Sequence, residues 1–353
     1  MSNISVDDFI SNYEEYLIID VRSEGEFDEY SILGSHNISI LNNDEKHTIG
    51  KLYKQNQSLA YRMGLEVGSA KLISIYDEIQ KLLKLEHKKK VLFYCFRGGT
   101  RSKSVYQSLL LLKMDCYLLE GGIKAYRKYI LENLCDFVQH FNFLVVAGNT
   151  GCGKTKYLKK VKNEGLPIID LEGLANNRGS IFGSIGLGRP TNQKNFDSLL
   201  FFELRKLKLD GNKIAIVESE SKKIGNALLP NCMMDQLNNG RHILIECSIK
   251  KRVENIKEDY LNLPLNKERI ITLINNNSHL KFHLGKDWNE KLIDHLQANR
   301  MDEFIKQLLV DYYDVLYSYS RKNIKIEKQL FSDDEEELTS LIKDQYLLMN
   351  QSM

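Results

Sequence analysis

The feature that most constrains the fold of this chain is one glycine-rich loop. It follows the apolar run 143–147 and reads Gly148-Asn149-Thr150-Gly151-Cys152-Gly153-Lys154-Thr155, which fits the spacing G-x-x-x-x-G-K-[ST]. Between a strand and a helix, such a loop directs its backbone N–H groups at one point and cradles a phosphate chain. We therefore predict a di- or triphosphate site shaped by Gly148, Gly151 and Gly153. Lys154 would neutralise the terminal phosphates, and Thr155 could ligate Mg²⁺.

A carboxylate that helps to hold Mg²⁺ is expected at the end of a neighbouring strand. Glu218 follows the apolar run 214–217 and is the first candidate, and Asp170 follows Ile168 and Ile169 and is the second. Each carboxylate is equally well explained as a strand-end cap. The six cysteines form no C-x-x-C pair, so we expect no metal site made of protein ligands alone.

A second loop with chemical character follows the apolar run 91–94. It reads Cys95-Phe96-Arg97-Gly98-Gly99-Thr100-Arg101-Ser102, which is a C-x5-R pattern. A turn from a strand into a helix aims backbone N–H groups at the sulfur, and Arg97 and Arg101 would add positive charge, so a thiolate of Cys95 would be stabilised. The same cradle could hold a tetrahedral oxyanion. The alternative is a buried structural cysteine, which two arginines and two glycines in one turn disfavour.

Length and composition indicate two globular domains with an extension. The chain has 353 residues, of which 42% are hydrophobic and 27% charged, and its net charge is +2. The net charge of the whole chain therefore does not indicate a nucleic-acid-binding protein. No apolar run approaches the roughly 20 residues that span a bilayer, and the first residues lack a signal sequence. We expect a cytoplasmic location, no membrane partner, and cysteines that are all thiols.

Short apolar runs alternate with stretches of helical spacing, which predicts an α/β fold with parallel sheets. We expect one domain at residues 1–138, a second at 142–250 that contains the phosphate loop, and a mostly helical extension at 251–353. The first of these domains resembles the rhodanese superfamily of sulfurtransferases and related phosphatases. The resemblance rests on the Cys95 loop and on residues 20–23 (DVRS), 32–38 (ILGSHNI) and 121–126 (GGIKAY). The loop is one residue longer than in simple sulfurtransferases, which keeps a phosphatase activity open.

Both loops in this order resemble the bacterial tRNA 2-selenouridine synthases, a family with a rhodanese-like domain followed by a P-loop α/β domain. The similarity extends to residues 170–183 (DLEGLANNRGSIFG), 217–225 (VESESKKIG) and 260–264 (YLNLP). Ser31 and Leu33 depart from the rhodanese pattern, where His and Pro are usual, and Asn177 stands where a His is frequent in the selenouridine synthases.

The resemblance implies a two-step exchange at the wobble uridine of certain tRNAs. A 2-thiouridine is first S-geranylated by geranyl diphosphate, and selenophosphate then supplies selenium. Cys95 would carry selenium as a selenylsulfide, and the phosphate loop would bind geranyl diphosphate, with ATP as the competing ligand. Arg178 would meet the diphosphate or tRNA phosphates. The implied partners are tRNA and an enzyme that makes selenophosphate.

Two other functions remain open from the sequence. One is a rhodanese-type cysteine phosphatase fused to an ATP-dependent P-loop kinase. The other is a noncatalytic, nucleotide-gated tRNA-binding protein, which the intact Cys95 and Arg101 disfavour.

Overall fold

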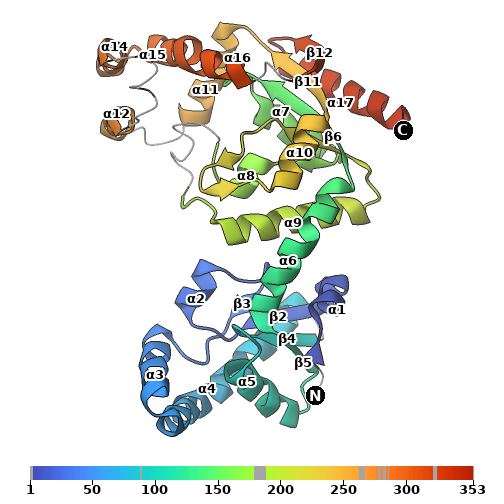
Figure 1. Ribbon diagram of the computed structural model, residues 1–353, viewed down its shortest axis with the longest axis vertical. Coiled ribbons are helices and arrows are strands. Elements are labelled where there is room, and N and C mark those ends of the chain that lie inside the picture. The colour runs from blue at the N-terminus through green and yellow to red at the C-terminus, as the bar shows by residue number, and fades with distance from the viewer. Residues whose placement is uncertain are drawn as a thin grey trace. The chain divides into compact units, whose positions relative to one another are not determined.

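The computed structural model describes residues 3–87, 90–178, 188–261, 267–276, 280, 284, 286–320 and 324–352. The chain divides into two compact units, one of residues 1–134 with 197–199, and the other of residues 135–196 with 200–353. The division falls inside helix α6 (Gly122–Gln139). Each unit is built on its own five-stranded sheet (Figure 1).

The sheet of the first unit is parallel and has the strand order β1-β5-β4-β2-β3. Its strands are β1 (Asn3–Ile4), β2 (Tyr16–Asp20), β3 (His36–Asn37), β4 (Lys90–Tyr94) and β5 (Cys116–Leu119). Every residue of β2 is buried. A strand covered on both faces reads as a continuous apolar run, as in residues 17–19.

Several helices of the first unit begin at a residue whose side chain caps them. The helices of this unit are α1 (Val6–Ser11), the 3₁₀ turn η1 (Tyr13–Glu15), α2 (Glu24–Glu29), α3 (Asn43–Gln55), α4 (Gln57–Glu86), α5 (Thr100–Leu111) and the start of α6. Asn42 caps α3, because its side chain accepts a hydrogen bond from the Glu45 N–H and the Glu45 carboxylate accepts one from the Asn42 N–H.

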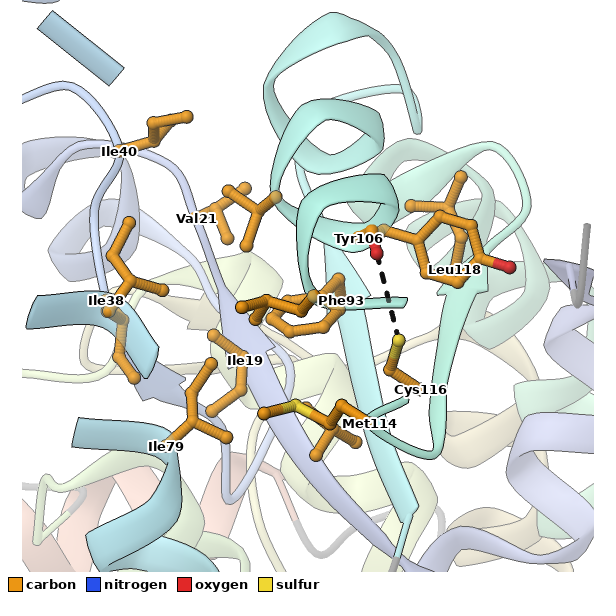
Figure 2. Close-up of a cluster of buried hydrophobic side chains, with 14 of the residues drawn as sticks. Ile19, Val21, Ile38, Ile40, Ile79, Phe93, Tyr106, Met114, Cys116 and Leu118 are labelled. Atoms are coloured by element: carbon orange, nitrogen blue, oxygen red, sulfur yellow. Dashed lines mark hydrogen bonds between the residues drawn. The ribbon is translucent and has the colours of Figure 1, made fainter. Parts of the chain in front are cut away.

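One core cluster of the first unit joins the sheet to α4 and α5 (Figure 2). Ile19 and Phe93 contribute from neighbouring strands, Ile79 from α4 and Tyr106 from α5, and all are at most 1% exposed. Because this packing fixes where β4 ends and α5 begins, it also fixes the ends of the Cys95 loop between them.

The sheet of the second unit is also parallel, with the order β12-β11-β6-β8-β7. Its strands are β6 (Asn142–Gly148), β7 (Ile168–Ile169), β8 (Ile214–Glu218), β11 (Arg241–Glu246) and β12 (Ile326–Phe331), and a separate antiparallel hairpin joins β9 (Lys223–Ile224) to β10 (Ala227–Leu228). The predicted α/β class with parallel sheets is thereby confirmed. Strand β12 was not expected, because only Leu330 in it is buried and the run looks polar.

Helices surround and extend this second sheet. They are α7 (Lys154–Asn163), α8 (Leu171–Ala175), α9 (Gln193–Leu209), α10 (Asn231–Asn239), α11 (Ile249–Leu261), α12 (Lys267–Asn276), α14 (Lys286–Gln297), α15 (Met301–Gln307), the π-helical segment η2 (Leu308–Tyr313), α16 (Asp314–Ser320) and α17 (Glu335–Gln351). One core cluster joins the sheet to α7 and α17. A second cluster packs the helices of residues 253–317 on one another.

One expectation about the cysteines is wrong. Cys135 of α6 and Cys232 of α10 form a disulfide, while the other four cysteines are free thiols. The two bonded residues are 97 positions apart, so no short spacing marks them as a pair. In the part of the chain that the structure describes, no helix is long and apolar enough to cross a membrane.

Candidate active sites: the cysteine loop and the phosphate loop

The Cys95 sulfur lies at the focus of its loop. Cys95 is 3% exposed and directly follows β4. Its Sγ accepts hydrogen bonds from the Gly99 N–H at 3.3 Å and from the Ser102 hydroxyl at 3.1 Å. Gly99 precedes α5 and Ser102 lies in its first turn, so the helix N-terminus faces the sulfur. The arrangement favours negative charge on Sγ.

The loop is held closed by the first turn of α6. The Ile123 N–H donates to the Cys95 carbonyl at 2.9 Å, and the Lys124 N–H donates to the Phe96 carbonyl at 3.2 Å. Gly122 has φ +57°, and a Cβ there would lie 2.7 Å from the Gly98 nitrogen and closer still to the Cys95 carbonyl oxygen. This close approach requires glycine and accounts for the Gly-Gly element noted in the sequence.

The two loop arginines lie in different surroundings. Arg101 forms an ion pair with Glu26, with N–O distances of 2.6 and 3.2 Å. Burial favours the neutral form of Glu26, but the hydrogen bonds and charge of Arg101 outweigh it and lower the pKa of Glu26 to about 2. Arg97 is exposed, with its guanidinium over the Phe96 ring. Of the two arginines, Arg97 is therefore the one open to a ligand.

The phosphate loop connects β6 to α7 in the expected way. Gly151 and Gly153 have φ of +83° and +78°, a conformation that glycine adopts without strain. The Lys154 ammonium donates to the Gly148 carbonyl at 2.9 Å. It also lies over the ring of Tyr317, 5.9 Å from the centroid. The Lys154 side chain therefore lies back against the phosphate loop, in which it would neutralise a bound phosphate.

Two side chains of α11 hold the phosphate loop by donating hydrogen bonds to its backbone carbonyls. Arg252 Nε donates to the Thr150 carbonyl at 2.9 Å, and Asn255 Nδ2 donates to the Gly151 carbonyl at 2.8 Å. Arg252 is itself held by a bidentate ion pair with Asp314. The sequence does not indicate either residue as a partner of the loop, because both lie about a hundred residues beyond it and belong to no motif.

Three carboxylates meet beside the loop. Glu172 in the first turn of α8, Glu218 at the end of β8 and Glu220 shortly after it bring ligand atoms within 4.8 Å of one another. The Thr155 hydroxyl donates to Glu172 at 3.2 Å. Burial is the largest cause, and repulsion between the carboxylates the second, of their raised pKa values. These are about 7 for Glu172, about 8 for Glu218 and about 7 for Glu220.

The structure distinguishes the two carboxylates predicted for Mg²⁺. Glu218 belongs to the cluster, whereas Asp170 caps α8 by accepting the Gly173 N–H at 2.8 Å. Glu172 and Glu220 were not singled out, although both lie in the segments that carry the family resemblance. Hard carboxylate oxygens next to a loop hydroxyl are the ligands that Mg²⁺ prefers. The residues present therefore fit that ion.

The segments that carry the resemblance also pack on each other. Asn177, which follows α8, is buried, and its side chain lies where a Cβ on Gly225 would come within 2.8 Å of it. Arg178 is half-buried beside it. Residues 179–187 and 262–266, which complete two of the quoted segments, lie outside the described residues.

Comparison with known proteins agrees with this pairing of sites. Residues 5–129 match the family model of the rhodanese-like domain, and residues 141–283 match that of the tRNA 2-selenouridine synthase AAA domain. A tRNA 2-selenouridine synthase of Alcanivorax borkumensis is 32% identical over 86% of this chain and 88% of its own length. This chain belongs to the tRNA 2-selenouridine synthase family.

Another tRNA 2-selenouridine synthase matches over a shorter stretch at higher identity. That of Nitrosomonas europaea is 35% identical over 73% of this chain and 67% of its own length. Among solved structures, a rhodanese-related protein from Thermoplasma volcanium is 22% identical, covers 36% of this chain and 93% of its own, and has a TM-score of 0.23.

Proposed function

We propose that this enzyme converts 2-thiouridine at the wobble position of tRNA to 2-selenouridine through an S-geranyl intermediate. The observation that carries the proposal is the Cys95 sulfur, which accepts two hydrogen bonds at a helix N-terminus within a chain of this family. The proposed co-substrates are geranyl diphosphate and selenophosphate. A selenophosphate-producing enzyme and tRNA are the proposed partners.

The first proposed step is alkylation of the tRNA sulfur at the phosphate loop. The 2-thio sulfur forms a bond to C1 of the geranyl chain, the C1–O bond breaks, and pyrophosphate leaves with the electron pair. The uracil N3 proton is then lost to solvent. Lys154 and the loop N–H groups stabilise the departing anion. Mg²⁺ would supply further positive charge when held by Thr155 and Glu218.

The second proposed step replaces the geranylated sulfur. Selenium of selenophosphate bonds to C2 of the uracil ring, the C2–S bond breaks, and geranyl thiol leaves after taking a proton. Water then cleaves the P–Se bond and releases phosphate. Selenium keeps its oxidation state throughout this route, so the exchange needs no oxidant or reductant.

The Cys95 loop is the proposed site for the selenium donor, with its N–H groups and Arg97 meeting the phosphate end. The Cys95 selenylsulfide expected from the sequence is two electrons more oxidised than selenophosphate. It forms only if the Cys95 sulfur bonds to selenium while the P–Se bond breaks and phosphite leaves with the electron pair. A thiol must then return two electrons to selenium. Mass spectrometry of the Cys95 peptide after mixing with selenophosphate alone distinguishes the routes.

The test of the proposed function uses an anticodon stem-loop that contains 2-thiouridine, followed by nucleoside mass spectrometry. Cys95→Ala is expected to accumulate the S-geranyl nucleoside: it blocks selenation where Cys95 carries selenium as a selenylsulfide, and it slows selenation where the Cys95 loop only holds selenophosphate. Lys154→Ala is expected to impair geranylation. Loss of geranyl transfer in a folded Cys95→Ala protein would contradict this division of labour. An obligatory hydrolysis of labelled ATP during geranylation would instead assign the phosphate loop to ATP.

A further inference from the structure

The carboxylate cluster of Glu172, Glu218 and Glu220 has a feature that repulsion among acids does not explain. Glu218 is 1% exposed, and its Oε2 has no hydrogen-bond partner among the described residues. A buried carboxylate oxygen without a partner loses its hydration and gains nothing in return. Its ligand atom lies within 4.8 Å of those of Glu172 and Glu220, so the unpartnered group belongs to a ready-made set of oxygens.

The charges around the cluster also favour a bound cation. The Lys154 ammonium acts on all three carboxylates, and in each case it favours the ionised form. When all three carboxylates are ionised, the single ammonium of Lys154 leaves two of their negative charges without compensation. A diphosphate entering the loop would meet those charges at close range, and a divalent cation would offset them.

The spacing fits an ion of modest size. Ligand oxygens lie about 2.1 Å from Mg²⁺, so two on opposite sides of the ion are about 4.2 Å apart. The cluster places its three ligand atoms within 4.8 Å of one another, which is close to that separation. The oxygen-only donor set favours Mg²⁺ or Mn²⁺ over Zn²⁺.

We propose that Glu172, Glu218 and Glu220 form a divalent-cation site made of protein ligands alone, which takes up Mg²⁺ before any diphosphate arrives. In most phosphate loops the cation is bridged by the substrate's own phosphates and held by the loop hydroxyl and a single acid. Here the loop hydroxyl of Thr155 already donates to a cluster carboxylate. The inference rests on the proposed function of this site and deepens it by naming its cation, and it departs from the expectation of no protein-only metal site.

Mn²⁺ titration of the full chain, freed of metal by chelation and containing neither diphosphate nor tRNA, tests the site. Electron paramagnetic resonance measures the free ion. We expect one Mn²⁺ per chain, displaced by Mg²⁺, and at least about tenfold weaker binding in Glu172→Gln, Glu218→Gln and Glu220→Gln. Asp170→Asn removes the same charge close by but outside the cluster, and it should bind within about threefold of the native chain.

The outcomes separate the possibilities. No Mn²⁺ bound at about 1 mM, binding only after pyrophosphate is added, or equal binding by all four variants would overturn the proposal. Thermal unfolding guards against misfolding, because added Mn²⁺ should raise the melting temperature of the native chain and of Asp170→Asn but not that of folded Glu218→Gln. A chain that binds Mn²⁺ yet transfers no geranyl group would refute the proposed function and leave the cation site standing.

Discussion

Gly122→Ala is expected to destabilise the first unit by about 2–5 kcal/mol. A left-handed backbone costs a residue with a Cβ about 1–2 kcal/mol. The new Cβ would also lie 2.7 Å from the Gly98 nitrogen and 3.0 Å from the Arg97 nitrogen, and these backbone atoms cannot swing aside. Overpacking of this kind adds about 1–3 kcal/mol. Either the Cys95 loop opens to make room for the new Cβ, or the first unit becomes less stable by most of that free energy.

Gly34→Ala is the matched control in the same unit. Gly34 has φ +68°, but its Cβ would meet only the Tyr13 hydroxyl at 3.4 Å, an ordinary contact. The difference between the two variants isolates the collision with the loop.

Hydrogen exchange followed by mass spectrometry measures the loss in each unit separately. Peptides from β2 and β4 report the first unit, and peptides from β6 provide an internal reference in the second. A Gly122→Ala loss no larger than that of Gly34→Ala would refute the tight closure of the Cys95 loop by α6.

Three further predictions concern other residues. Ser102→Ala removes a hydrogen-bond donor to the Cys95 sulfur. Nucleoside mass spectrometry should show selenation slowed about tenfold and geranylation unchanged. Selenation at the native rate would contradict a role for the hydroxyl. The pKa of Glu26 is lowered to about 2, so its carboxylate stabilises the fold fully above about pH 4.5 and loses that contribution as pH falls toward 2. The loss of stability between pH 7 and pH 3, measured by urea unfolding, should be smaller in Glu26→Gln than in the native chain. An equal loss in both proteins would contradict the ion pair. Alkylation of the denatured chain should label four thiols before reduction and six after it, since Cys135 and Cys232 are bonded; six before reduction would disprove the disulfide.

The parts of the sites that the sequence predicted are those encoded in adjacent residues. The phosphate loop and the Cys95 loop are single runs between a strand and a helix, so local pattern suffices to locate them. Glu218 was found because a strand end beside the loop is a predictable place. Arg252 and Asn255 depend on how α11 packs against the loop, and no spacing within the sequence reports that contact.

Strand β12 and the pairing of the carboxylates escaped prediction for a related reason. An edge strand has one neighbour and little buried surface, so β12 carries a weak apolar signal and is recognised only by its parallel pairing with β11. Glu172 and Glu220 come from segments almost fifty residues apart, and only the tertiary fold brings them together.

The bracing of the phosphate loop by α11 bears on how fast and how tightly an anion is captured. Two loop carbonyls are already tied to Arg252 and Asn255, and Arg252 is anchored in turn by Asp314. The conformational entropy of shaping the loop is therefore lost when the chain folds and not when the ligand arrives. The diphosphate proposed to bind there should meet a loop backbone that is already shaped, so the rearrangement left for its capture is that of the Lys154 side chain.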